Sequence, residues 1–193
     1  ISHQKNELIA PDQAVAAAKS GNDRINGDVY VEYQRRLRAA NALDFDDLIM
    51  CTVTVLRQFP EAREQYRRRF RHVLVDEYQD TNTAQYQFIR ELCGDDPVEL
   101  DDGARSVDPP ELMVVGDSDQ SIYAFRGATI RNIIDFEKDF PGARTILLEQ
   151  NYRSTQTILT AANNLIKVNL NRPAKNLWTD QGDGDKIVGY VAD

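Results

Sequence analysis

The chain has 193 residues and a formal net charge of −8, with 31 acidic and 23 basic side chains. This length fits one domain of ordinary size or two small ones, and no apolar run is long enough to span a bilayer. Because an acidic chain is not typical of nucleic-acid binders, any DNA contact is expected in a local groove or in one completed by further sequence. Two cysteines, Cys51 and Cys93, without metal or disulfide spacing, indicate reduced thiols and a cytoplasmic location.

Residues 1–41 are predicted to be helical and rather polar. One helix is expected over 11–19 and a second over 24–40, with an inward face formed by Val29, Tyr33 and Leu37. Three arginines near the end of the second helix favour a solvated helix face, with a phosphate contact as the alternative: Arg35, Arg36 and Arg38. This segment has little core of its own and is interpreted as the tail of a larger helical domain.

Residues 43–48, Leu-Asp-Phe-Asp-Asp-Leu, mark the start of a helix. Asp44 is expected to cap it, and Asp46 and Asp47 suit the positive end of the helix dipole. Capping explains these aspartates better than metal ligation does. An inward stripe is predicted at Phe45, Leu48, Ile49, Thr52, Val53 and Leu56. A further helix is expected to begin at Pro60 and to end in three arginines, 67–69, which suit a helix C-terminus.

The run His72–Val75 is short, apolar and β-branched, and predicts a strand buried on both faces of a parallel sheet. Asp76 and Glu77 follow it directly. Ligands of open α/β sheets bind outside the carboxyl ends of the strands. There, Asp76 can hold a magnesium ion that bridges nucleotide phosphates, and Glu77 can accept the proton of an attacking water. The alternative is that the acidic pair opens a solvated turn.

A helix capped by Thr81 or Asn82 is expected to run to Cys93, and the acidic segment 94–110 is interpreted as a mobile insertion. The second strand, predicted over 112–115, also runs into a polar loop. That loop carries Gln120, Tyr123, Phe125 and Arg126. Aromatic rings beside an arginine suit the stacking of unpaired bases, with the guanidinium on a phosphate. The alternative is that the two rings belong to the core.

The third strand is predicted over 145–148, and it too ends in polar residues. Ser154 is expected to cap a helix whose inner face is formed by Ile158, Leu159, Ala162, Leu165 and Ile166. At this strand-to-helix junction Arg153 can reach a phosphate oxygen as an arginine finger does, and Tyr152 can stack on a base. A last short strand is expected over 187–191. His72, inside the first strand, is expected to have a structural role.

Three polar strand ends in this order resemble motifs II, III and IV of the UvrD/PcrA/Rep-type superfamily 1 DNA helicases: DEYQD at 76–80, VVGDSDQSIYAFRGA at 114–128 and LEQNYRS at 148–154. The resemblance extends over nearly the whole chain and favours an actinobacterial UvrD/PcrA-like branch. It implies an α/β fold, with an incomplete RecA-like (P-loop NTPase) parallel sheet and flanking helices over 42–145. Residues 1–41 would be the tail of a helical insertion domain. Residues 146–193 would begin a second RecA-like domain, with a hinge near 143–149.

The resemblance also implies roles toward ATP and Mg²⁺. Asp76 matches the magnesium-binding aspartate, Glu77 the catalytic base, and Gln120 the glutamine that senses the γ-phosphate and couples it to DNA. Tyr152 matches the residue that stacks on adenine, and Arg153 matches the first arginine finger.

Three further residues match groups that contact single-stranded DNA in the family: Tyr123, Phe125 and Arg126. The family often has Trp where Phe125 stands, so the ring keeps its face but offers less stacking area.

The sequence departs from the family in several respects, and the most important is that no GxxxxGK[ST] phosphate-binding loop occurs in it. The chain is therefore interpreted as an internal fragment of an ATP-dependent DNA helicase that acts in repair or replication. Such an enzyme couples ATP hydrolysis to movement on single-stranded DNA and to unwinding at duplex junctions, with 3′ to 5′ polarity by resemblance. By itself it is expected to be inactive, with Arg153 facing solvent or paired with a carboxylate. The alternatives are a non-catalytic DNA- or partner-binding module, the motor part of a helicase–nuclease, and a metal-dependent phosphodiesterase.

Overall fold

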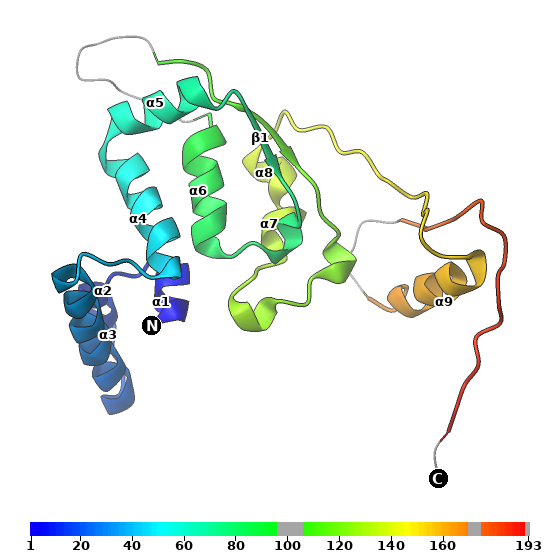
Figure 1. The fold of residues 1–193 in the computed structure, drawn as a ribbon, viewed down its shortest axis with the longest axis horizontal. Helices are drawn as coiled ribbons and strands as arrows, with labels where there is room; N and C mark the ends of the chain where they lie inside the picture. The colour runs from blue at the N-terminus through cyan, green and yellow to red at the C-terminus, as the bar shows by residue number, and fades with distance from the viewer. Residues whose placement is uncertain (96–105, 170–174, 192–193) are drawn as a thin grey trace. The chain divides into compact units, whose positions relative to one another are not determined.

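The computed structural model describes residues 1–95, 106–169 and 175–191 (Figure 1). The chain forms two compact units, Ile1–Phe140 and Pro141–Asp193. The first unit is a mixed α/β structure, mostly helical, with two parallel strands among its described residues. Most of the insertion expected at 94–110 lies outside the described residues. No helix in the described part of the chain is long and apolar enough to cross a membrane.

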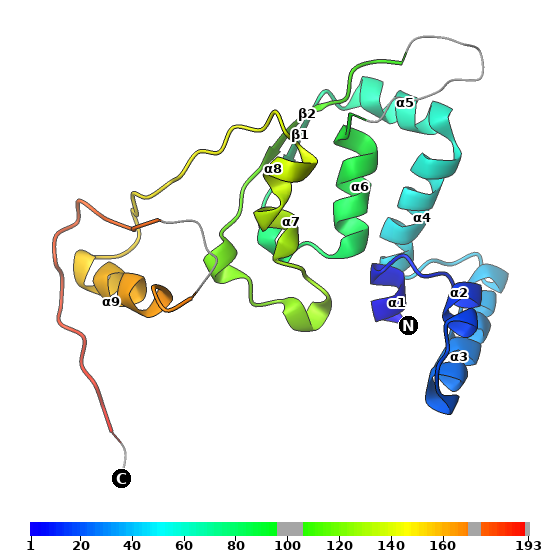
Figure 2. The ribbon, with the colours of Figure 1, turned by 180° about the vertical axis from the view of Figure 1, so that it is seen from behind.

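Three helices open the first unit: α1 (Ser2–Asn6), α2 (Pro11–Ala16) and α3 (Gly21–Ala39). Helices α2 and α3 lie side by side (Figures 1 and 2). At Gly27 their contact leaves no room for a side chain, since a Cβ there would lie 2.9 Å from Val15 Cγ2. This close approach helps to set which face of α3 is buried.

The face of α3 that is buried differs from the prediction. Tyr30 and Gln34 are buried, whereas Val29 and Tyr33 are exposed. The buried pair is polar, but the Tyr30 hydroxyl donates to Ile9 O at 3.2 Å and Gln34 Nε2 donates to both oxygens of Asp47 at 3.1 Å. Buried polar groups that find partners in this way are tolerated, and the apolar period therefore misidentifies the inner face.

Helices α4 (Phe45–Gln58), α5 (Pro60–Arg69) and α6 (Thr83–Cys93) begin where their caps predict. Asp44 Oδ1 accepts from the Asp47 N–H at 2.8 Å, and Asn82 Oδ1 accepts from the Gln85 N–H at 2.9 Å. The predicted capping of α4 by Asp44 is thus confirmed, as is the end of α6 at Gly94. At the other end of α5, the buried Arg67 donates to the backbone oxygens of Glu91 and Gly94 at 3.1 and 2.8 Å.

The inward stripe predicted for α4 is only partly correct. Val53 and Leu56 are buried, but Phe45 and Leu48 are exposed. The first turn of α4 instead buries Asp47, whose carboxylate meets Lys5 at 2.8 Å. Because a polar side chain occupies the inner position there, the apolar side chains of this turn face outward.

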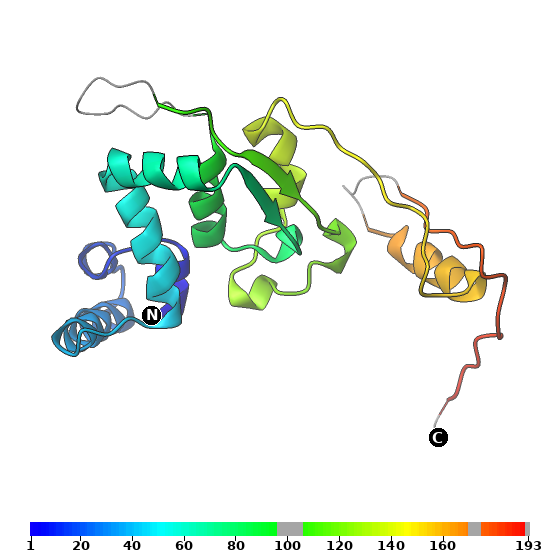
Figure 3. The ribbon, with the colours of Figure 1, turned by 45° about the horizontal axis from the view of Figure 1, so that its top comes forward.

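The sheet consists of β1 (His72–Val75) and β2 (Glu111–Val114), in parallel and in register from His72–Glu111 to Val75–Val114 (Figure 3). Exposed and half-buried residues alternate along both strands, and Leu74 and Met113 are 73% and 57% exposed. The prediction of a strand buried on both faces is therefore wrong. Among the described helices, α7 (Arg131–Ile134) and α8 (Phe136–Asp139) lie against one face of the strands (Figure 2). In the described part of the chain the other face of the sheet is open, and it carries the exposed side chains of His72, Leu74 and Met113.

The second unit contains α9 (Gln156–Ile166) and extended segments. The strands predicted over 145–148 and 187–191 are not formed, because a strand needs a neighbour for its backbone hydrogen bonds. Within the described residues of this second unit, strand pairing is limited to a bridge between Gln150 and Trp178.

Helix α9 also differs from the prediction. Thr155, and not Ser154, is its N-cap. The helix buries Leu159 and Asn163, and Ile166 is half-buried. The other residues predicted to face inward are exposed: Ile158, Ala162 and Leu165.

Candidate functional site

The acidic pair lies directly after β1, where the two strands of the sheet end. Asp76 and Glu77 are both exposed. Asp76 Oδ1 accepts from the Glu77 N–H at 2.8 Å. The next N–H, that of Tyr78, donates to Val115 O at 2.9 Å and so connects this loop to the residue that follows β2. Glu77 has a φ of 50°, in the left-handed region that non-glycine residues rarely adopt. Such backbone strain persists where the surroundings enforce it, and it is common at functional sites.

Gln79 joins the loops that follow the two strands. Its side-chain nitrogen donates to Glu77 Oε2 at 2.8 Å and to Asp80 Oδ2 at 3.2 Å, while its oxygen accepts from the Asp117 N–H at 3.0 Å. Gly116 passes so close that a Cβ there would lie 2.6 Å from Gln79 Oε1. Sequence reasoning missed this residue, because only the fold shows which loop its amide reaches.

Gln120 lies in the loop after β2, at the end of a short 3₁₀ helix, η2 (Ser118–Gln120). Its side-chain nitrogen donates to Asp117 Oδ2 at 2.8 Å, and Asp117 Oδ1 accepts from the Asp119 N–H at 2.9 Å. Gln120 is exposed. The amide predicted to sense a phosphate is therefore accessible, on the same loop that contacts Gln79.

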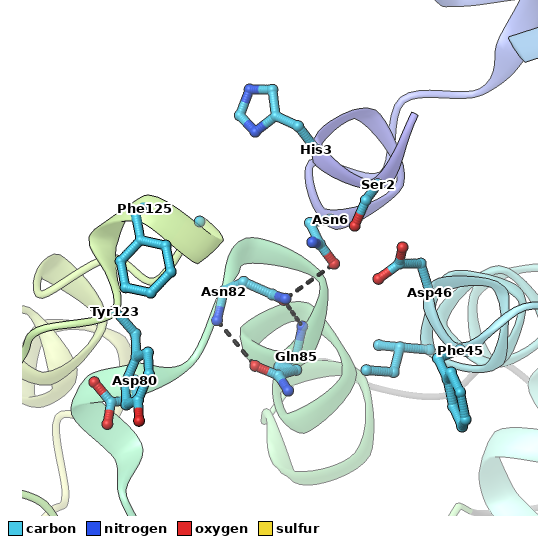
Figure 4. Close-up of a pocket in the computed structure, with 12 residues that line it drawn as sticks. Ser2, His3, Asn6, Phe45, Asp46, Asp80, Asn82, Gln85, Tyr123 and Phe125 are labelled. Atoms are coloured by element: carbon cyan, nitrogen blue, oxygen red, sulfur yellow. Dashed lines mark hydrogen bonds between the residues drawn. The ribbon is translucent and has the colours of Figure 1, made fainter.

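The aromatic pair of this loop borders an open cavity of about 720 Å³ (Figure 4). The ring centroids of Tyr123 and Phe125 lie 5.9 Å apart at an interplanar angle of 42°. Phe125 is 78% exposed, so the alternative that it belongs to the core is wrong. Arg126 is the last residue of the adjoining 3₁₀ helix η3 (Ala124–Arg126), and Gly127, with a φ of 85°, turns the chain after it.

Other walls of the cavity come from α1, α4 and α6 (Figure 4). Asn82 Nδ2 donates to Asn6 Oδ1 at 3.0 Å and so ties α6 to α1. Phe45, on α4, is 88% exposed. Phe45 therefore lines the cavity, although the sequence predicted it on the inward face of α4. The remaining side chains around the cavity are mainly polar: Ser2, His3, Asp46, Ile49, Asp80 and Gln85.

In the second unit, the loop before α9 presents Tyr152 and Arg153. Asn151 Oδ1 accepts from the N–H groups of Arg153 and Ser154 at 2.9 and 2.8 Å and so shapes the turn. The Tyr152 hydroxyl donates to Gln150 Oε1 at 2.9 Å. Both Tyr152 and Arg153 are exposed, as expected for Arg153 in this chain.

The donor set at the end of β1 suits a magnesium ion of the nucleotide-bound kind. Within the described residues, no group of three or more His, Cys, Asp or Glu side chains is placed to hold a metal. Mg²⁺ in nucleotide sites takes one or two protein carboxylates and completes its shell with water and phosphate oxygens. The exposed Asp76 meets that requirement.

A parallel sheet with an acidic pair and an amide at its strand ends, beside an open aromatic cavity, fits a nucleotide-dependent protein that handles unpaired nucleic acid. Comparison with known families agrees with this class. Residues 1–141 match the UvrD/REP helicase N-terminal domain, and residues 146–193 match the UvrD-like helicase C-terminal domain. The chain belongs to the UvrD/REP helicase family.

Several curated proteins are similar over the whole chain. The ATP-dependent DNA helicase UvrD1 of Mycobacterium tuberculosis (strain ATCC 25618 / H37Rv) is 65% identical over 196 residues, and that of Mycobacterium leprae (strain TN) is 62% identical over 200. The ATP-dependent DNA helicase PcrA of Bacillus subtilis (strain 168) is 49% identical over 193 residues. In each case all of this chain is covered, but it spans only about a quarter of the relative, 25%, 25% and 24% respectively.

Proposed function

We propose that this chain is an internal segment of an ATP-dependent DNA helicase. Residues 42–145 contribute the later part of a first RecA-like motor domain, residues 1–41 the tail of a helical insertion domain, and residues 146–193 the start of a second motor domain. The proposal is supported by the family match over residues 1–141 and by relatives named ATP-dependent DNA helicases. The full-length protein is proposed to act in DNA repair or replication in the cytoplasm, where thiols such as Cys51 and Cys93 stay reduced.

In this proposal the strand-end residues of the first unit serve ATP hydrolysis. Asp76 would hold the magnesium ion, which neutralises charge on the β- and γ-phosphates when bound. Glu77 accepts the proton of the attacking water, and Gln120 contacts the γ-phosphate from the neighbouring loop. All three are exposed at the same ends of the two strands, where nucleotides bind in open α/β folds.

The open cavity is proposed to take one or more bases of single-stranded DNA. Tyr123, Phe125 and Phe45 offer ring faces, and stacking on aromatic faces tolerates every base. Asn82, Gln85 and Asn6 supply amides that satisfy the polar edges of a base. Arg126, which follows Phe125 in the chain, is assigned a backbone phosphate.

The second unit is proposed to complete the nucleotide site when the two motor domains close on ATP. Tyr152 stacks on adenine, and the Arg153 guanidinium stabilises negative charge on the transferred phosphoryl group. Their exposure on one loop supports a role in contacting a partner surface.

The observation that carries the proposal is the acidic pair at the end of β1, with Glu77 held by an amide from within the same loop. In the full-length protein, Glu77→Gln is expected to reduce kcat for ATP by about 10²–10⁴-fold, because an amide cannot take the proton. ATP binding, measured by a fluorescent analogue, should stay near normal. A near-normal kcat in this variant would show that Glu77 is not the general base. This chain by itself is expected to show no DNA-stimulated ATPase, because its sequence has no phosphate-binding loop.

A further inference from the structure

Gln79 is a buried amide whose hydrogen bonds reach both loops at the strand ends. It is 1% exposed, and it contacts Glu77 and Asp80 through its nitrogen and Asp117 through its oxygen. Carboxylates accept and a backbone N–H donates, so only this orientation of the amide satisfies all three partners. Because a lost hydrogen bond is costly at a buried site, the amide is held in place.

The bond to Gln79 anchors one oxygen of Glu77, whose side chain is otherwise exposed. A glutamate loses conformational entropy when its side chain is ordered, and a general base must stay within hydrogen-bond reach of the proton it takes. The Gln79 amide occupies Oε2 of Glu77 at 2.8 Å. This contact leaves Oε1 and the second lone pair of Oε2 for the proton.

The other end of the same amide is attached to the loop after β2. The Asp117 N–H donates to Gln79 Oε1, and the Asp117 carboxylate accepts from Gln120 Nε2 at 2.8 Å. The same loop continues to Tyr123 and Phe125 at the cavity. Because Gly116 lies against the amide oxygen, a shift of this loop would press on Gln79.

We propose that Gln79 is a positioning residue that couples occupancy of the aromatic cavity by single-stranded DNA to the orientation of Glu77. DNA on Tyr123 and Phe125 restrains the loop, the loop holds Gln79 through the Asp117 N–H, and Gln79 holds Glu77 in its productive rotamer. This inference rests on the proposed function, because Glu77 acts as a base only in a nucleotide-hydrolysing protein.

The test uses the variant Gln79→Leu of the full-length helicase that contains this chain. Leucine has a side-chain volume similar to that of glutamine but makes neither the hydrogen bond to Glu77 nor the one from the Asp117 N–H. With saturating oligo-dT, kcat is expected to fall about 10- to 100-fold, the scale for losing the supporting partner of an active-site group. KM for ATP should change little, since the lost interaction serves the chemical step. The ratio of the rates with and without DNA should fall toward 1. Full stimulation by DNA in this variant would overturn the proposal.

Asn132→Leu is a matched control. Asn132 is a buried amide, 8% exposed, whose side-chain nitrogen donates to Thr81 O and Oγ1 at 3.1 and 3.0 Å. Its loss should lower the melting temperature but leave DNA stimulation intact. If Gln79→Leu and Asn132→Leu lose activity only in proportion to their lost stability, Gln79 is merely structural and the proposal fails.

The double variant Glu77→Gln/Gln79→Leu distinguishes this inference from the proposed function. Because Gln79 acts through Glu77, its residual rate should equal that of Glu77→Gln alone, and an independent further loss would contradict the coupling. A near-normal rate in Glu77→Gln refutes the proposed function itself. An inactive Glu77→Gln beside a fully stimulated Gln79→Leu refutes only the role of Gln79.

Discussion

Two phenylalanines illustrate, at the scale of single residues, how exposure separates core from site. Phe45 and Phe125 come from α4 and from the loop after β2, and both line one cavity while most of each ring is exposed. Exposing an aromatic ring forgoes the hydrophobic stabilisation that its burial would bring. Clustered exposed rings are typical of surfaces that bind a partner, which agrees with the role proposed for this cavity.

Phe125→Ala and Phe45→Ala are each expected to weaken single-stranded DNA binding by the full-length protein by about 1–3 kcal/mol, the scale of one base–aromatic stack. The melting temperature should change little, because both rings are mostly exposed. Fluorescence anisotropy with a labelled oligonucleotide at fixed salt measures the effect. Phe136→Ala is the control: that ring packs on Tyr78 and Phe140, so it should cost stability and spare DNA affinity. Unchanged DNA affinity in both test variants would contradict the base-stacking role.

The Asp44 carboxyl is expected to make the stability of the fold depend on pH. Burial raises the pKa of Asp44, but hydrogen bonds from Lys5, the Asp47 N–H and Tyr33 outweigh it, so the folded pKa is lowered. A carboxyl with a lowered folded pKa stabilises the fold above its unfolded pKa, about 3.9, and loses that contribution as pH falls below about 4.

Asp44→Asn keeps an N-cap oxygen but removes the charge. Thermal unfolding of the chain between pH 6 and pH 3 should therefore show a larger loss for the original chain than for this variant. The gap between the two should narrow as pH falls. Asp12→Asn, at an exposed carboxyl in the first turn of α2, is the control and should leave the original slope. A constant gap across this pH range would show that the charge of Asp44 contributes nothing.

At the scale of elements, a buried lysine joins three helices. Lys5 of α1 meets Asp44 Oδ2 at 2.7 Å and Asp47 Oδ1 at 2.8 Å at the start of α4, and Gln34 of α3 donates to the same Asp47. Burial alone would lower the pKa of Lys5, but its two aspartate partners together raise it, so the lysine stays charged. These polar contacts, together with the close packing on α2, determine which face of α3 is inward.

Lys5→Met is expected to destabilise the first unit by about 3–5 kcal/mol, because it leaves Asp47 buried without its counter-charge. Urea unfolding of the chain, followed by circular dichroism, measures this change. Arg35→Met, which breaks an exposed pair with Glu32 on α3, is the control and should have little effect. Equal midpoints for the two variants would mean that the Lys5 network does not hold the three helices together.

At the scale of the whole molecule, both units carry exposed apolar segments. The first exposes Leu74 and Met113 on the open face of its sheet, and the second exposes its extended segments, with Ile146, Leu148, Val188 and Tyr190 among them. The chain spans about a quarter of its relatives' length. We expect other parts of the full-length protein to cover these surfaces, to extend the sheet of the first unit and to supply strand neighbours for the extended segments of the second.

Arg153→Ala in the full-length protein tests the role proposed for the second unit. An arginine finger stabilises charge that develops in the transition state and is worth about 10³–10⁵ in kcat. The variant should therefore lose kcat by far more than it loses ATP affinity, and ATP should no longer favour domain closure, as followed by energy transfer between labelled domains. Lys167→Ala, on the C-cap of α9, is the control. A full kcat in the Arg153 variant would rule the finger out.

Much of the chain's local structure follows from the sequence alone. The caps at Asp44 and Asn82, the helix start at Pro60 and the end at Gly94 depend on residues a few positions apart, so a short window contains the whole interaction. The polar ends of the first two strands also follow from the sequence, because an apolar run followed by charged residues is a local signal. The resemblance to the family rests on three such transitions from apolar to polar residues, of which the third, at 148–154, follows no formed strand.

The tertiary structure alone decided which side chains meet. Phe45 is exposed at the edge of the cavity because Asp47 occupies the inner side of its turn, and Gln79 bridges two loops that are separated by a helix and an insertion in the sequence. The segment 145–148 has strand-forming residues but no strand, because β structure requires a neighbouring backbone that the described part of this unit does not supply. Burial, pairing and strand formation depend on partners distant in the sequence, and no local pattern contains them.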